Sequence, residues 1–205
     1  MTSQPPVYLV DDDRAVRDAV ALLLSTYGLR VETFAHPLDF LSRQPELEPG
    51  CIVLDLRMPA ITGLQLQQKL QESGCGWPIV LLTGHGDMQA CRRAFKAGAV
   101  DFLSKPVDEH VLMEAVNAAF AALARYREQD EQRALLARLT EREREVLVLV
   151  AQGYATKEIA AALELSPRTV ETHRAHISEK IGSTSVVEFA RLAQASLEPG
   201  PGGNP

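Results

Sequence analysis

The hydrophobic pattern of the chain changes between residues 124 and 139. Before residue 124, short apolar runs alternate with segments in which apolar residues recur at helical spacing. After residue 139, only helical spacing is found. The 205 residues are enough for two small domains, each with its own core. The pattern therefore predicts an α/β domain followed by a small all-α domain.

Five short apolar runs in the first part are strand candidates: residues 7–10, 29–33, 51–54, 79–82 and 100–103. The helical segments that alternate with them are 14–27, 37–44, 63–73, 87–97 and 108–124. The third and fourth runs show no polar alternation, which is expected when helices cover both faces of a strand. Five consecutive βα units indicate a doubly wound, five-stranded parallel sheet.

The second part is predicted to contain helices over 141–152, 156–163, 167–181 and 186–196. Thr140 and Glu143 have the spacing of a capping box, and Thr156 and Ser166 are the expected N-caps of the next two helices. Two short helices followed by a longer one predict a helix-turn-helix. The expected organisation is a first domain over 1–124, a helical linker over 125–138, a helix-turn-helix domain over 139–197 and a disordered tail over 198–205.

Charge and composition narrow the class of protein. The net charge of −6 arises mainly before residue 125, where 10 Lys and Arg face 15 Asp and Glu, whereas the remainder has 11 against 12. An acidic total does not exclude DNA binding, because only local charge acts across a Debye length of about 8 Å. No apolar run reaches the roughly 18 residues of a membrane span and no signal peptide is recognisable, so we expect a cytoplasmic protein without a membrane partner.

Polar residues gather where the predicted strands end. Asp11, Asp12 and Asp13 follow the first strand, and Asp55, Thr83 and Lys105 follow the third, fourth and fifth. Ligands bind at the carboxyl ends of the strands in open α/β sheets. Clustered carboxylates suit Mg²⁺, and a lysine with a hydroxyl group can hold phosphoryl oxygens. The set predicts phosphoryl transfer to a carboxylate, with Asp13 expected to serve only as a helix cap.

Four segments carry a resemblance to a known family: VDDD at 10–13, LDLRMP at 54–59, LTGHGD at 82–87 and AGAVDFLSKP at 97–106. They resemble the receiver domain of two-component response regulators, which has a flavodoxin-like fold. The resemblance implies that Asp55 accepts a phosphoryl group from a phosphohistidine on a sensor histidine kinase.

The same resemblance assigns roles to the neighbouring residues. Asp12, Asp55 and the backbone carbonyl of Arg57 would hold Mg²⁺, and Asp11 would act through water. Lys105 would contact the phosphoryl oxygens. Thr83 and Phe102 would form the switch pair that reports phosphorylation.

The predicted helix 167–181 has two different faces. At 100° per residue, Val170, His173, Ile177 and Ile181 lie on one side and would pack inward. The opposite side carries short and polar groups suited to base edges, and residues around it can reach phosphates: Arg168, Thr169, Arg174, His176 and Lys180. Residues 166–182 contain only three Lys and Arg against two Glu, so a single copy should bind DNA weakly.

The segment LTEREREVLVLVAQGYATKEIAAALELSPRTVETHRAHISEKIG resembles the LuxR-type output domain, and the whole chain resembles a FixJ-type response regulator. By this resemblance Glu171, Thr172 and Ala175 would read bases, and Lys157 would also contact DNA. The implied protein is not an enzyme in the ordinary sense, although its receiver can catalyse its own phosphoryl transfer and dephosphorylation. Phosphorylation would produce a homodimer that binds promoter DNA, with RNA polymerase as a further partner.

Two alternatives remain open at this stage. A DNA-binding regulator could be switched by oxidation of Cys51, Cys75 or Cys91, although their odd number and the lack of a CxxC pair favour reduced thiols. An aspartate-nucleophile phosphatase would use Asp11 as its nucleophile. The phosphatase alternative assigns no function to Asp55 and does not explain the helix-turn-helix.

Overall fold

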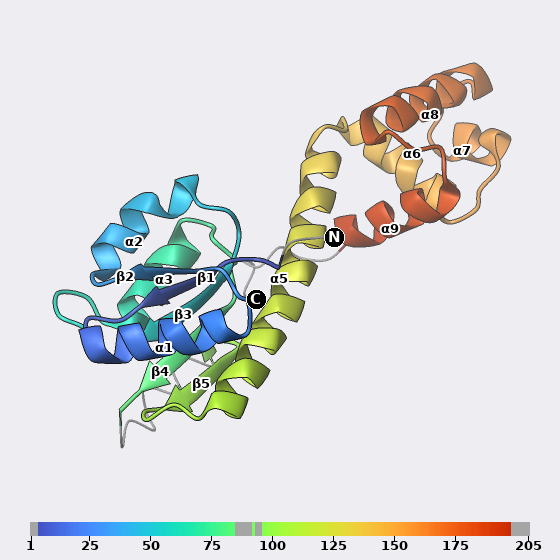
Figure 1. Ribbon diagram of the computed structural model, residues 1–205. Helices are drawn as coiled ribbons and strands as arrows, with labels where there is room; N and C mark the ends of the chain where they lie inside the picture. The colour runs from blue at the N-terminus through green and yellow to red at the C-terminus, as the bar shows by residue number, and fades with distance from the viewer. Residues whose placement is uncertain (1–3, 85–91, 93–95, 198–205) are drawn as a thin grey trace. The chain divides into compact units, whose positions relative to one another are not determined.

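The computed structural model describes residues 4–84, 92 and 96–197. It divides into two compact units, Met1–Tyr126 and Arg127–Pro205 (Figure 1). The first unit has an α/β fold and the second consists of helices. The predicted fold class, a doubly wound parallel sheet followed by a small helical domain, is confirmed.

The first unit is built on five parallel strands in the order β2-β1-β3-β4-β5. Their bounds are Val7–Val10 for β1, Val31–Phe34 for β2, Cys51–Asp55 for β3, Ile79–Thr83 for β4 and Asp101–Ser104 for β5. The strand order reverses at β1, so the crevice at the carboxyl ends of β1 and β3 is the place where such a sheet binds ligands.

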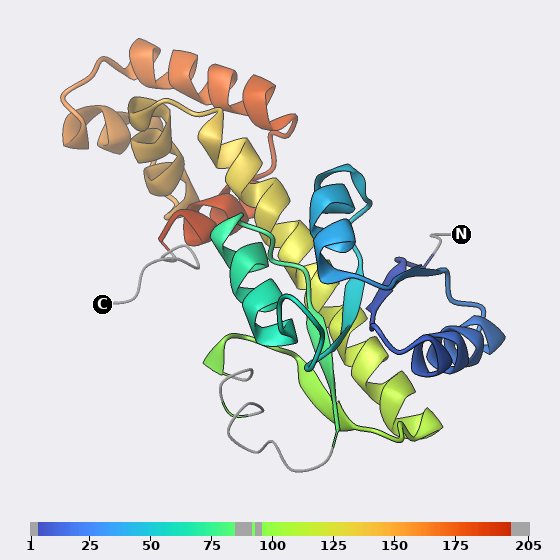
Figure 2. The same ribbon diagram turned by 90° about the vertical axis from the view of Figure 1, so that its left-hand side faces the viewer.

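Helices cover both faces of this sheet (Figure 1 and Figure 2). The bounds are Arg14–Thr26 for α1, Pro37–Arg43 for α2, Gly63–Glu72 for α3 and Glu109–Ala137 for α5, with a short 3₁₀ helix over Gln44–Glu46. The sides of α1 and α5 that face the sheet are buried in one core, and those of α2 and α3 in the other. Most of the helix expected over 87–97 lies outside the described residues.

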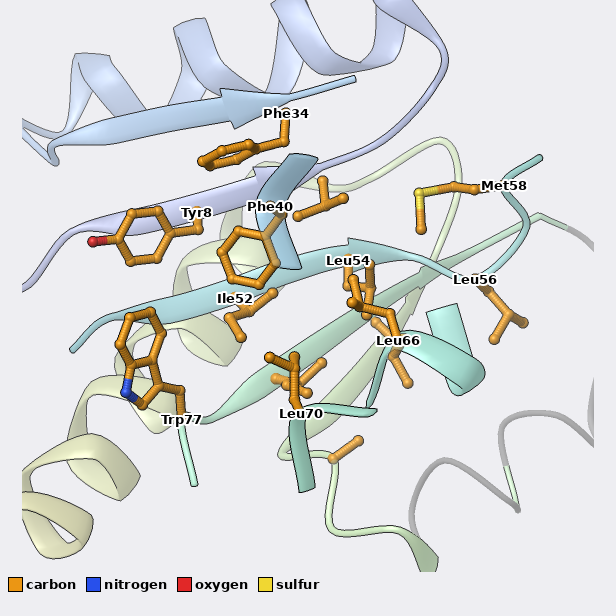
Figure 3. Close-up of a cluster of buried hydrophobic side chains, with 14 residues drawn as sticks. Tyr8, Phe34, Phe40, Ile52, Leu54, Leu56, Met58, Leu66, Leu70 and Trp77 are labelled. Atoms are coloured by element: carbon orange, nitrogen blue, oxygen red, sulfur yellow. The ribbon is translucent and has the colours of Figure 1, made fainter. Parts of the chain in front are cut away.

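The core beneath α2 and α3 contains a cluster of aromatic side chains around Tyr8. The ring of Tyr8 in β1 stacks on that of Trp77, with the ring centroids 5.5 Å apart. The centroid of the Phe40 ring in α2 lies 5.8 Å from that of Tyr8 (Figure 3). The Tyr8 hydroxyl donates a hydrogen bond to the Glu48 carbonyl at 2.8 Å. This buried ring therefore satisfies its one polar group while it packs.

Helix starts are set by local capping. Asp13 caps α1 by accepting hydrogen bonds from the backbone amides of Ala15 and Val16, so the prediction for Asp13 is confirmed. Thr62 and Gln65 form a full capping box at the start of α3. Its first residue, Gly63, lies against the Asp55 carbonyl, so this helix start adjoins the end of β3.

The second unit contains α6 (Glu141–Ala151), α7 (Thr156–Ala162), α8 (Pro167–Ile181) and α9 (Val186–Leu197). Their buried faces form one core that includes Val146, Leu147, Ile159 and Val170. Thr140 with Glu143 forms the predicted capping box of α6, and Ser166 caps α8 ahead of Pro167.

The predicted N-cap of α7 is wrong. Ala155 occupies the cap position and Thr156 is the first helical residue. The Glu158 carboxylate accepts a hydrogen bond from the Ala155 amide at 2.7 Å, so an amide at the start of the helix is satisfied without a cap side chain.

Helix α5 runs without interruption through the segment expected to be the linker. Tyr126 packs against the core of the first unit, and Leu136 is buried in the core of the second. No helix among the described residues is both long enough and apolar enough to cross a membrane.

Candidate functional site

Three strands of the sheet bring predicted charged residues to one of its edges. Asp11 follows β1, Asp55 is the last residue of β3, and Lys105 follows β5. The Lys105 Nζ lies 2.7 Å from Asp11 Oδ2 and 2.7 Å from Asp55 Oδ1. One ammonium therefore bridges two carboxylates that come from separate strands. We call Asp11, Asp12, Asp55 and Lys105 the acidic site.

The carboxylates of the acidic site are oriented by backbone amides. The Asp13 amide donates to Asp11 Oδ1 at 2.9 Å, and the Arg57 amide donates to Asp55 Oδ2 at 3.2 Å. Asp11 is fully buried and Asp55 is only 5% exposed, whereas Asp12 is exposed. The two buried carboxylates therefore have fixed positions while Asp12 faces solvent.

Burial and mutual charge change the acid-base behaviour of the acidic site. Burial raises the pKa of Asp55 above its usual value; the Lys105 ammonium opposes this rise and the Asp11 carboxylate adds to it. Burial by itself would lower the pKa of Lys105, but the hydrogen bonds and charges of Asp11 and Asp55 outweigh it, so that pKa is raised. Lys105 therefore stays charged.

The acidic site can hold a metal ion. One carboxylate oxygen from each of Asp11, Asp12 and Asp55 lies within 4.8 Å of the others. Three carboxylates against one ammonium leave excess negative charge, and all the donors are hard oxygens. This donor set suits a hard divalent cation.

Thr83 and Phe102 lie on the same face of the sheet. Leu81 and Phe102 are paired in the register of β4 and β5; Leu81 is buried in the core under α2 and α3, and Phe102 packs against that core. Residues two apart on a strand point the same way, so Thr83 is on that face too. Its hydroxyl donates to the Gly84 carbonyl at 2.9 Å, and Thr83 is 6% exposed.

Sequence reasoning missed two residues that support the acidic site. The Arg17 guanidinium donates to the Asp11 backbone carbonyl at 2.7 Å. A Cβ on Gly63 would lie 2.4 Å from the Asp55 carbonyl oxygen. Arg17 gave no sequence signal beyond its position on α1. Gly63 carried a weak one, because a glycine directly after a capping threonine can mark a close backbone approach.

The helix-turn-helix is formed by α7 and α8, joined through Glu164, which has a left-handed φ of 56°. Val170 and Ile177 of α8 are buried in the core as predicted. The predicted DNA-contacting residues that are exposed are Lys157, Arg168, Glu171, Thr172, Ala175 and His176. Thr169, Arg174 and Lys180 are half-buried.

Lys180 differs from the other predicted phosphate contacts. Its Nζ lies 2.9 Å and 2.7 Å from the two carboxylate oxygens of the buried Glu143 in α6. A DNA phosphate would have to share this ammonium with Glu143. Sequence reasoning missed the pair because its partners are 37 residues apart.

The cysteines of the described residues are poor redox switches. Cys51 is fully buried, and burial raises its thiol pKa to about 12. Burial also raises the pKa of Cys75. The reactive form of cysteine is the thiolate, so both changes lower its reactivity. Cys91 lies outside the described residues.

Two family models match the chain. Residues 7–117 match the response regulator receiver domain, and residues 137–193 match the bacterial regulatory proteins of the luxR family. The transcriptional regulatory protein FixJ of Azorhizobium caulinodans is 40% identical over 94% of this chain and 93% of its own length. The response regulator protein TmoT of Ectopseudomonas mendocina is 38% identical over 92% of this chain and 87% of its own length.

The chain belongs to the FixJ-type response regulators. Solved structures agree with this assignment. The response regulator StyR has a TM-score of 0.71 and 38% identity, covering 94% of this chain and 99% of its own. Full-length FixJ of B. japonicum has a TM-score of 0.60 and 35% identity, covering 97% of this chain and all of its own.

Membership in this family decides between the open alternatives. A FixJ-type response regulator is a phosphorylation-activated regulator of transcription, not a classical enzyme, and its receiver implies a sensor kinase as partner. Its LuxR-type domain is a DNA-binding helix-turn-helix. The phosphatase alternative also lacks an accessible nucleophile, because Asp11 is fully buried and is bonded to Lys105.

Proposed function

We propose that Asp55 is the phosphoacceptor of this response regulator and that the donor is a phosphohistidine of a sensor histidine kinase. The observation that carries the proposal is the 2.7 Å contact between Lys105 Nζ and Asp55 Oδ1 at the carboxyl edge of the sheet. Lys105 pairs with both buried carboxylates, but Asp55 keeps 5% exposure whereas Asp11 is fully buried.

The transfer needs positioning and charge neutralisation more than covalent chemistry from the protein. An Asp55 carboxylate oxygen forms a bond to phosphorus as the phosphorus–nitrogen bond of the phosphohistidine breaks. The leaving imidazole nitrogen keeps the electron pair and takes up a proton from solvent. Lys105 then pairs with a phosphoryl oxygen. Its ammonium already lies beside the accepting carboxylate, so it needs to move little. In this sense the receiver catalyses its own phosphorylation, and we propose that it also catalyses its own dephosphorylation.

Mg²⁺ is the cation that we assign to the acidic site. Asp12, Asp55 and the backbone carbonyl of Arg57 would hold it. Both oxygens of Asp11 already accept hydrogen bonds, which supports a role for Asp11 through a water molecule. Bound Mg²⁺ would offset the charge of the carboxylates and of the incoming phosphoryl group.

Thr83 and Phe102 would report phosphorylation to the rest of the receiver. Among the described residues, the Thr83 hydroxyl bonds only the Gly84 carbonyl, so it can exchange that bond for one to a phosphoryl oxygen. Its movement would free space on the face that it shares with Phe102, and the Phe102 ring would turn into that space.

Phosphorylation would then produce a homodimer that binds promoter DNA and engages RNA polymerase in the cytoplasm. Two half-sites roughly double the phosphate contacts of one weakly charged domain. The DNA-contacting residues that we propose are Lys157, Arg168, Thr169, Glu171, Thr172, Arg174, Ala175, His176 and Lys180. We assign the dimer contact to β5 and to the helix expected over 87–97, and most of that expected helix lies outside the described residues.

The domain boundaries that fit this function are a receiver over 1–124, a helical linker over 125–138 and a DNA-binding domain over 139–197. The family matches, which end at residue 117 and resume at residue 137, support this division. The tail 198–205, expected to be disordered, lies outside the described residues.

The test is phosphorylation with acetyl phosphate and Mg²⁺, followed by intact mass, light scattering and DNA footprinting. We expect one phosphoryl group on the wild type, none on Asp55→Asn, a doubled mass in solution and a protected promoter site. Phosphorylation of Asp55→Asn at the wild-type rate would refute the phosphoacceptor assignment. An unchanged monomer mass after full phosphorylation would refute the dimer.

A further inference from the structure

The second helix of the helix-turn-helix presents few free hydrogen-bonding groups at its start. Residues near the N-terminus of such a helix reach the base edges of the major groove. In the first nine residues of α8, the exposed side chains beyond Pro167 are Arg168, Glu171, Thr172 and Ala175. Our inference rests on the DNA-binding function of this helix.

Both threonines in this part of α8 use their hydroxyl groups within the helix. Thr172 Oγ1 donates to the Arg168 carbonyl at 3.0 Å, and Thr169 Oγ1 lies 2.7 Å from Ser166 Oγ. Ala175 has no polar side-chain atom. Within the described part of the chain, the Glu171 carboxylate has no hydrogen bond or ion pair. The free groups are therefore the Arg168 guanidinium and the Glu171 carboxylate.

The charge of α8 is so small that a glutamate on it weakens DNA binding unless its carboxylate contacts a base. Of the three cations between residues 166 and 182, Lys180 is already paired with Glu143. The charges of Arg168 and Arg174 are then balanced by those of Glu171 and Glu179, so α8 is close to neutral. A carboxylate in the major groove is repelled by the phosphates, and it favours only a sequence that offers it a hydrogen-bond donor.

The base edges of the major groove offer such a donor in two bases. Cytosine presents its N4 amino group, and adenine presents its N6 amino group beside the N7 acceptor. An ionised carboxylate only accepts hydrogen bonds, so the N7 of adenine would oppose it. We propose that Glu171 is a specificity-determining residue that accepts a hydrogen bond from the N4 amino group of a cytosine in each operator half-site.

The experiment selects binding sites for the full chain, phosphorylated with acetyl phosphate and Mg²⁺, from a pool of random DNA duplexes. The wild type should enrich a site with a fixed cytosine in each half. Glu171→Gln should change that position to adenine, because an amide can bond N6 and N7 of adenine together. Glu171→Ala should lose the preference at that position alone, by about tenfold to a hundredfold.

Glu179→Ala is the matched control, because Glu179 is an exposed carboxylate on the same helix two turns further on. It removes the same charge, so it should raise affinity for unselected DNA as Glu171→Ala does, but it should leave the enriched site unchanged. Identical enriched sites for the wild type and Glu171→Gln would overturn this inference alone. A wild-type selection with no enriched site would overturn the DNA-binding function and this inference together.

Discussion

Lys180 and Glu143 form an ion pair that fastens the end of α8 to the first turn of α6. The Glu143 side chain is 4% exposed and the Lys180 side chain 34%. Glu143 also accepts hydrogen bonds from the amide and hydroxyl of Thr140. The same carboxylate therefore completes the capping box of α6 and binds Lys180 of α8.

Breaking this pair should destabilise the second unit. We expect Lys180→Met to lower its free energy of unfolding by about 2 kcal/mol, between the values typical of exposed and of buried pairs. Urea unfolding followed by circular dichroism measures the effect. Trp77, the single tryptophan, lies in the first unit, so the urea unfolding transition followed by its fluorescence should be the same in the variant and the wild type.

Glu128→Ala, which breaks the exposed pair with Arg191, is the control. It should lower the free energy of unfolding by less than about 1 kcal/mol. Equal effects of the two substitutions would contradict the prediction.

The same pair should make the stability of the second unit depend on pH. Burial raises the pKa of Glu143, but Lys180 and Thr140 lower it more, and the net shift is below the usual 4.5. The folded carboxylate binds a proton less readily than the unfolded one. The stabilisation is therefore complete above about pH 4.5 and is lost as the pH falls through the lowered pKa. Urea unfolding between pH 6 and pH 3 should show a shallower decline for Lys180→Met than for the wild type. Parallel curves would argue against this role.

Removing the ammonium of the acidic site should expose the repulsion between its carboxylates. We expect Lys105→Met to destabilise the first unit by about 3 kcal/mol, because Asp11 and Asp55 remain buried without their cation. Mg²⁺ should then raise the thermal midpoint, followed by Trp77 fluorescence, more in the variant than in the wild type, because the site is more negative. Lys69→Met, at an exposed lysine of α3, should behave as wild type. A Mg²⁺ response of the same size in all three proteins would count against a metal at this site.

The contact between Gly63 and the Asp55 carbonyl should make that glycine hard to replace. The Cβ of Gly63→Ala would lie 2.4 Å from a backbone oxygen, so β3 or α3 must shift. We expect a loss of about 1–3 kcal/mol of stability and slower phosphorylation by acetyl phosphate. For Gly84, a Cβ would meet no atom of the described residues within 4 Å. Gly84→Ala should therefore leave the unfolding midpoint nearly unchanged, and a similar loss in both variants would show that the close approach has no special effect.

The elements of this protein could be predicted from local sequence. Runs such as Cys51–Asp55 are apolar on both faces because helices cover them, and the cap residues Asp13 and Thr140 act within three positions along the chain. The place of Asp55 and Lys105 at strand ends follows from the same pattern, since parallel strands end at one edge. These features depend on the period of strand or helix and on short-range hydrogen bonds.

Only the tertiary structure decided which of these groups touch. Lys105 and Asp11 are 94 residues apart and Lys180 and Glu143 are 37 apart, and no local period relates them. Their contacts exist because packed strands and helices bring distant side chains within 3 Å of each other. The sequence alone thus determined the kinds of element and the edge at which the chemistry lies. Packing determined that Lys105 bridges two carboxylates and that Lys180 is held by Glu143, because the energy of a buried charge depends on its neighbours in space.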